Sequence, residues 1–424
     1  MAKLREPVDP MHGCEEVMHR PIVVYLDSQD FSRLSDAKMD ASISPVRDKL
    51  LELKREGIAR FAFSDVLVYE CLPVKPEDAA LSLKRIESIV EFCDGQSLPP
   101  ASEVIRSELG LLISQEGKYS KFANQPFSGH WFPKLDLTSE TRDVERNAAK
   151  TAFSNLKETM GLSLSRNERR AFLKKFKSSN KADGYSSLAS QGMSDLASLY
   201  PIDLSDKHLL AEYLRCGNSR VLLPLVEKSL GDLLFFSRWC VDNWDGGQKF
   251  VRSLRSGNDQ TKASLIRFYE HMKEVNGRAL EVISERELSS MLADKIEEMR
   301  DWFVSSFAAI QIKNFLGVDV PNDGRFRPSL VKTPAVLSWL EFTAAVLVRS
   351  AAVAHPRNPH KKSHSDFADS MHVLYLPRVD IFRADRFTSQ ILEGSLSFQS
   401  TVVEPSLEKL PETIHRAWDR RGAC

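Results

Sequence analysis

Strand-like stretches of hydrophobic residues lie near the beginning of the chain and are separated by helix-like ones. Apolar runs at 21–26 and 58–63 predict two buried strands, and the pattern at about 44–56 predicts a helix between them that ends at a glycine. Ser64 and Asp65 follow the second run and are typical of the start of a helix. This order predicts the opening of a βαβα unit.

The rest of the chain is mostly of helical periodicity. Segments 76–93 and 100–113 predict amphipathic helices, and from about 138 to 354 almost every pattern is helical. Strand character returns only at 378–385 and 397–404. Strands at both ends with helices between them predict one α/β domain with a parallel sheet, interrupted by a large all-α insertion on its rim.

Composition narrows the class of protein. The 424 residues are 42% hydrophobic and 27% charged, which suits a folded protein with a sizeable core. Lys plus Arg and Asp plus Glu both total 58, so the net charge gives no information about a nucleic-acid partner, and any basic surface must come from local segregation of charge. The six cysteines form no CxxC pair, and the N-terminus has no apolar run typical of a signal peptide, so we expect a cytoplasmic protein. The long apolar segment at 334–356 contains Glu341 and Arg349, which predicts a core helix and no membrane span.

Acidic residues stand where the predicted strands end. Asp27 directly follows the first strand, and Asp385 ends the strand at 378–385. Glu70 lies on the helix after the second strand, and Asp366 and Asp369 share one face if their segment is helical. Because ligands bind at the carboxyl edge of parallel sheets, these acids predict an oxygen-ligand metal site.

At these residues the chain resembles the PIN-like nuclease family, whose members have a three-layer α/β/α fold and cut RNA, or sometimes structured DNA, with Mg²⁺ or Mn²⁺. The resemblance rests on VVYLDSQDFSRL, on FSDVLVYECL and on DFADSMHVLYLPRVDIFRAD, taken in that order. It covers roughly residues 20 to 115 and 360 to 424. The implied division is a PIN-like catalytic domain in two parts, 18–115 and 331–424, around a helical insertion at 116–330, a segment that a standard PIN domain lacks.

The resemblance also implies a set of site residues. The catalytic and metal-binding acids would be Asp27, Glu70, Asp369 and Asp385, with Asp366 as a companion or substitute for Asp369. Such a pocket of carboxylates holds one or two Mg²⁺ or Mn²⁺ ions, which activate a water for attack on phosphate. The family implies products with 5′-phosphate and 3′-hydroxyl ends. This chain differs from the family pattern at Arg383, where a small hydroxyl residue is frequent, and at Gln29, where Asn or Ser is common.

Simpler interpretations exist for the same residues. Asp27 can cap the helix that follows it, and Glu70 can be a surface or ion-paired residue. The segment at 355–372 has four histidines without the spacing of a zinc site, which favours a solvated loop: His355, His360, His364 and His372. The cations of this loop could instead hold a phosphate backbone: Arg357, Lys361 and Lys362.

A basic helix is predicted at 165–181. Its cations are candidates for binding an RNA backbone, with bases stacked on neighbouring phenylalanines: Arg166, Arg169, Arg170, Lys174 and Lys175. The alternative is an amphipathic helix whose Phe172 and Phe176 face the core while the charges face water.

Together these features predict a metal-dependent ribonuclease that acts on RNA without a membrane partner. No GxSxG elbow and no phosphate-binding GxxxxGK[ST] loop is present, which disfavours a serine hydrolase and a nucleotide-driven motor. Two alternatives remain: a structure-specific DNA nuclease, and a non-catalytic RNA-binding or scaffolding protein with the same fold. A homo-oligomer is also left open.

Overall fold

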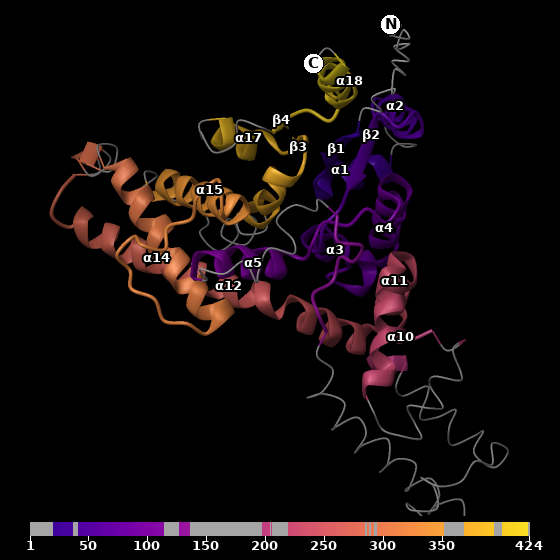
Figure 1. Ribbon diagram of the computed structural model, residues 1–424, viewed down its shortest axis with the longest axis horizontal. Coiled ribbons are helices and arrows are strands. Elements are labelled where there is room, and N and C mark those ends of the chain that lie inside the picture. The colour runs from indigo at the N-terminus through magenta and orange to yellow at the C-terminus, as the bar shows by residue number, and fades with distance from the viewer. Residues whose placement is uncertain are drawn as a thin grey trace, which may run out of the picture.

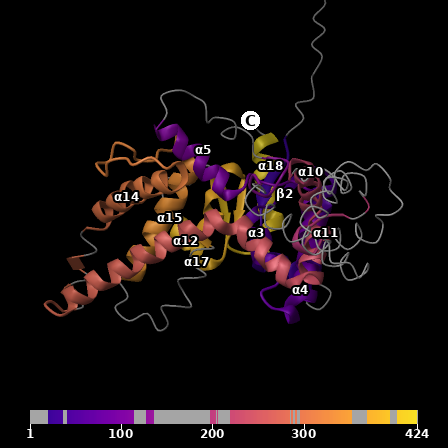
Figure 2. The ribbon, with the colours of Figure 1, turned by 90° about the horizontal axis from the view of Figure 1, so that it is seen from below.

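The computed structural model describes most of the chain and is shown in Figure 1. The described residues are 20–36, 41–113, 127–135, 197–203, 205, 219–284, 286–287, 290–291, 295–351, 369–393 and 401–422. Within them the protein is a mixed α/β structure in which a small sheet is surrounded by many helices (Figures 1 and 2).

The sheet has four strands, and every pair of neighbours is parallel. Its strands are β1 (Ile22–Tyr25), β2 (Ala59–Ala62), β3 (Ile381–Arg383) and β4 (Val402–Glu404), in the order β2-β1-β3-β4. Strands from the two ends of the chain therefore lie side by side at the centre of the sheet. All carboxyl ends point to the same edge because the strands are parallel.

Helices cover both faces of this sheet. Those of the first part of the chain are α1 (Ser28–Ser35), α2 (Ser44–Arg55), α3 (Asp65–Cys71), α4 (Ala79–Cys93) and α5 (Ala101–Ile113). Those of the middle of the chain are α10 (Ser219–Gly231), α11 (Leu233–Asp242), α12 (Trp244–Leu280) and α14 (Ile296–Leu316). Those of the last part of the chain are α15 (Pro334–Ala351), α17 (Arg386–Glu393) and α18 (Leu410–Gly422). The described residues also form the short 3₁₀ helices η1 (Pro76–Asp78) and η4 (Val373–Arg378).

The central strand β1 is buried on both sides. Ile22 and Val24 belong to one hydrophobic core, and Val23 and Tyr25 belong to the other. Successive side chains of a strand point to opposite faces, so a strand between two helical layers must be apolar throughout. This explains the unbroken apolar run at 21–26.

The structure confirms the predicted α/β class with a parallel sheet. The predicted strands at 21–26 and 58–63 and the helix at 44–56 form almost where expected, and Ser64 caps α3 by accepting a hydrogen bond from the backbone N–H of Leu67. The two late strands form as well, but they are shorter than the predicted segments.

Helices of the predicted insertion contribute to both cores and not only to the rim. Leu233 and Phe236 of α11 join the core that contains Ile22, and Phe307 of α14 joins the core that contains Tyr25. The apolar segment that begins at Pro334 forms the buried helix α15, as expected. No helix in the described ranges is long and apolar enough to cross a membrane.

The burial of one acid away from the sheet edge leads us to predict that the stability of the protein depends on pH. Glu108 of α5 is 3% exposed, and its two carboxylate oxygens accept hydrogen bonds from the backbone N–H groups of Ala335 and Val336 at the start of α15. Burial raises the pKa of Glu108 to about 7, although these hydrogen bonds and the charge of Arg378 oppose the shift. The folded protein therefore keeps this proton at pH values where the unfolded chain has lost it.

Stability should consequently fall as the pH rises between the usual glutamate pKa and 7. We expect the free energy of unfolding to drop by about 2 kcal/mol more in the wild type than in Glu108→Gln between about pH 5 and pH 7.5, because the amide cannot ionise. Urea denaturation at both pH values measures this difference. The exposed Glu87→Gln serves as a control and should follow the wild type. Parallel pH profiles for Glu108→Gln and the wild type would contradict the prediction.

Candidate active site

The two acids at the strand ends have well-defined positions because each caps a helix. The Oδ1 atom of Asp27 accepts hydrogen bonds from the backbone N–H groups of Gln29 at 2.7 Å and Asp30 at 2.9 Å. The Oδ1 atom of Asp385 likewise accepts from the N–H of Thr388 at 2.7 Å. The capping role of Asp27 is thus confirmed. It is compatible with ligand binding, because in the described residues the second oxygen of each carboxylate accepts no hydrogen bond.

Glu70 lies on α3 and is paired with a histidine. The Nε2 atom of His372 lies 3.0 Å from Oε2 of Glu70. Burial alone would raise the pKa of Glu70, but the charge of His372 and its hydrogen bond, with a further bond from Ser28, lower it on balance. Glu70 is therefore a carboxylate held ionised in a mostly buried position, and the ion-pair interpretation of this residue is confirmed.

His372 is part of a buried hydrogen-bonded chain that starts in the sheet. The hydroxyl of Tyr25 lies 2.6 Å from Nδ1 of His372 and 2.6 Å from the hydroxyl of Ser64. The aromatic ring of Tyr25 stacks on those of Tyr375 and Phe382, with centroids 5.7 and 5.5 Å apart. This packing fixes the Tyr25 hydroxyl, which orients the imidazole ring toward the carboxylate of Glu70.

Asp369 lies three residues before His372 on the same helical segment. Burial raises its pKa to about 7, the charge of His372 opposes the shift, and the charges of Glu70, Asp385 and Asp27 add to it. Because charges act over short range in proteins, the four predicted acids share one electrostatic neighbourhood at the carboxyl edge of the sheet.

A second buried ion pair lies beside Asp27. The guanidinium of Arg383, at the end of β3, lies 3.1 Å from Oδ1 of Asp30, and the two side chains are 9% and 0% exposed. Burial and the charge of Asp27 raise the pKa of Asp30, and Arg383 opposes this shift. Arg383 thus compensates a buried acid that accepts a hydrogen bond from the backbone N–H of Asp27.

The other candidate residues from the sequence lie in segments outside the described residues. Asp366 and the proposed RNA-binding cations lie outside the described residues: Arg166, Arg169, Arg170, Lys174, Lys175, Arg357, Lys361 and Lys362. The same is true of His355, His360 and His364. The expected solvated loop is wrong for the fourth histidine, because His372 is 4% exposed.

The fit of a metal ion depends on both chemistry and geometry. The donors are hard carboxylate oxygens. Burial raises the pKa of Asp369, the charges of the other three acids add to this shift, and a divalent cation offsets both effects. The donor chemistry therefore fits Mg²⁺ or Mn²⁺. In the part of the chain that the structure describes, however, no group of three or more His, Cys, Asp or Glu side chains is arranged to hold an ion.

Three residues of this site were not among the predicted ones. Asp30 and Tyr25 flank Asp27 in the sequence, and His372 follows Asp369 by three positions. That spacing, one turn of a helix, is the one signal that could have joined His372 to Asp369. Nothing in the sequence could have paired Asp30 with Arg383.

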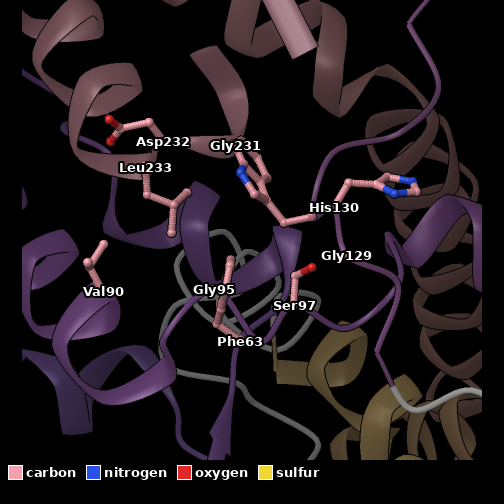
Figure 3. Close-up of a pocket in the computed structure, with 10 residues that line it drawn as sticks. Phe63, Val90, Gly95, Ser97, Gly129, His130, Gly231, Asp232 and Leu233 are labelled. Carbon is pink, nitrogen blue, oxygen red and sulfur yellow. The ribbon is translucent and has the colours of Figure 1, made fainter. Parts of the chain in front are cut away.

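A separate cavity of about 440 Å³ lies near the end of β2 (Figure 3). Its walls come from the turn after α4, the segment around Trp131 and the junction of α10 and α11. The residues that line it are Phe63, Val90, Gly95, Ser97, Gly129, His130, Trp131, Gly231, Asp232 and Leu233. None of the four candidate acids is among them, so the cavity is distinct from the acid site.

Comparisons with known proteins found no similar protein. No family model matches the chain, and no curated protein or solved structure matches it.

Proposed function

We propose that this protein is a metal-dependent ribonuclease of the PIN-like type, whose site is formed by Asp27, Glu70, Asp369 and Asp385. The observation that carries the proposal is the environment of Asp369: burial raises its pKa to about 7, and the charges of the other three acids act in the same direction. Mutually repelling carboxylates at the carboxyl edge of a parallel sheet are costly for stability, which is typical of functional sites.

Each side chain has a distinct role in this proposal. The backbone caps hold Asp27 and Asp385 with one oxygen directed away from the helix N–H groups. Glu70 is kept ionised and oriented by His372. Burial raises the pKa of Asp369 to about 7, so its ionisation near neutral pH depends on a nearby positive charge. The chemistry supplied by Mg²⁺ or Mn²⁺ at such carboxylates is activation of a water and neutralisation of charge on the phosphoryl group.

Calorimetry with Mn²⁺ and the full chain tests the site. We expect the wild type to bind Mn²⁺ and Asp27→Asn to bind it at least about tenfold more weakly, since one charged ligand is lost. Asparagine preserves the helix cap, so α1 should remain folded. Asp232→Asn is a matched control, because Asp232 also caps a helix but is exposed and lies outside the acid site.

The activity is tested on the same proteins with labelled single-stranded RNA and with structured DNA. RNA cleavage that requires Mn²⁺ or Mg²⁺ and gives 5′-phosphate ends supports the proposal, whereas cleavage of DNA alone would assign the structure-specific nuclease. A wild type that takes up no Mn²⁺ and cleaves neither substrate would overturn it.

One observation favours the non-catalytic alternative. His372 already neutralises Glu70, and Arg383 pairs with Asp30 beside Asp27, so part of the negative charge is compensated without a metal. If the protein binds RNA but takes up no Mn²⁺ and does not cleave the RNA, the non-catalytic alternative is the right one.

A further inference from the structure

The longest helix of the insertion passes along the acid site. In Figure 1, α12 runs beneath the sheet from the side of α11 toward α14, and the view from below in Figure 2 shows it passing α3. The side-chain amide of Gln248 on α12 donates a hydrogen bond to the carbonyl of Pro73, just after α3, at 3.3 Å. The helix is therefore held against the element that carries Glu70.

Arg255 is the cation of α12 that approaches this element directly. Its guanidinium carbon lies 5.5 Å from the ring centroid of Tyr69, the residue before Glu70. Besides burial and His372, the charge of Arg255 acts on Glu70 and contributes to the lowered pKa of that carboxylate. The aromatic ring restrains the guanidinium at a position beside the acids, and its face favours a positive charge there.

Further charges follow on the same face of the helix. Arg252 precedes Arg255 by three residues, and Lys262 follows it by seven, so the three lie on one side of α12. Arg252 is exposed, whereas Arg255 and Lys262 are half-buried. Burial lowers the pKa of Lys262, and so does the charge of Arg255, which places these two cations near each other. Asp259 on the same face acts in the opposite sense on Lys262.

Arg255 is not used in an ion pair within the described residues, where its close partner is the uncharged ring of Tyr69. A guanidinium on an aromatic ring keeps its N–H groups available for an anion in the plane of the fork. Phosphate suits this arrangement, because its oxygens accept two parallel hydrogen bonds from arginine. A polyanion that approaches four carboxylates also needs nearby cations to offset the repulsion.

We propose that Arg255, with Lys262 two turns further along α12, holds a phosphate group of the RNA backbone next to the acid site. The insertion then contributes directly to substrate binding. This inference rests on the proposed ribonuclease function, because it takes RNA as the substrate.

The test compares Arg255→Gln with Arg278→Gln in the full chain. Arg278 lies on the same helix, about 34 Å further along its axis, and forms an exposed ion pair with Glu274. RNA affinity is measured by fluorescence anisotropy with a labelled single-stranded RNA in EDTA, which prevents metal-dependent cleavage, between about 50 and 200 mM salt. We expect Arg255→Gln to bind about tenfold more weakly and to reduce the salt slope by about 0.7, and Arg278→Gln to match the wild type.

Two further variants separate binding from packing. Arg255→Lys keeps the charge and should keep the salt slope, and Tyr69→Phe keeps the ring under the guanidinium and should bind RNA as the wild type does. Thermal unfolding of each variant shows whether the fold is kept. A loss of affinity in Arg255→Lys equal to that in Arg255→Gln, with the slope unchanged in both, would assign Arg255 a packing role and overturn the inference.

The outcomes also distinguish this inference from the proposed function. If the wild type binds and cleaves RNA and Arg255→Gln binds it equally well at every salt concentration, only the inference about Arg255 is overturned. A wild type that neither binds nor cleaves RNA would overturn both.

Discussion

Under the proposed ribonuclease function, replacement of Asp369 by asparagine is expected to abolish RNA cleavage while leaving the RNA bound. Asp369 is the residue on which the charges of Glu70, Asp385 and Asp27 act together, so it lies within reach of all three. The amide removes a negative ligand, and losing several kcal/mol of charge stabilisation in the transition state corresponds to a rate at least about a thousandfold lower. Removing one carboxylate also reduces repulsion of the phosphate backbone, so affinity should stay equal or rise.

Single-turnover cleavage and anisotropy binding measured on the same preparation separate the two effects. Asp232→Asn, the same substitution at an exposed helix cap, should retain wild-type cleavage. A variant Asp369→Asn that cleaves at the wild-type rate would remove Asp369 from the site. Loss of RNA binding together with cleavage would instead indicate that Asp369 supports the local fold.

The parallel sheet was predictable because its signal is local. A strand buried on both faces is apolar throughout, and the run at 21–26 has this property, as β1 confirms. The start of α3 and the end of α2 were predictable for equally local reasons. Ser64 caps α3, and Gly57 adopts a φ of +73° just after α2. Such features depend on neighbouring residues only, so the chain itself reveals them.

The surroundings of the acids were less predictable because they depend on contacts between distant segments. His372 lies in a histidine-rich, polar stretch of sequence, yet it is buried by Tyr25 and Glu70, which are hundreds of residues away in the chain. Asp30 lies four residues before Leu34, on the buried face of α1, but its pairing with Arg383 of β3 joins segments more than 300 residues apart in the chain. The packing of α12 past Tyr69 involves a segment of the chain for which the resemblance offered no guide.

The pair of Asp30 and Arg383 leads to the second large effect. Asp30 is fully buried and lies beside Asp27, whose backbone N–H donates to Oδ2 of Asp30 at 3.3 Å. Without Arg383, the neighbourhood would contain two acids and lose the cation that opposes their raised pKa values. Burial raises the pKa of Asp30 to about 8 even beside Arg383. Breaking a buried ion pair by removing one partner costs about 3 kcal/mol or more, because the remaining acid must either stay charged without solvation or take up a proton.

We therefore expect Arg383→Met to lower the free energy of unfolding by about 3 kcal/mol in urea denaturation at pH 7. The double variant Asp30→Asn/Arg383→Met should recover most of this loss, because it removes the uncompensated acid, and asparagine can still accept the hydrogen bond from the N–H of Asp27. Arg33→Met is the matched control. It breaks the exposed pair of Arg33 with Glu408, whose side chains are 39% and 47% exposed, so it should cost less than about 1 kcal/mol. A double variant no more stable than Arg383→Met would show that Arg383 stabilises the protein through its packing and not by compensating Asp30.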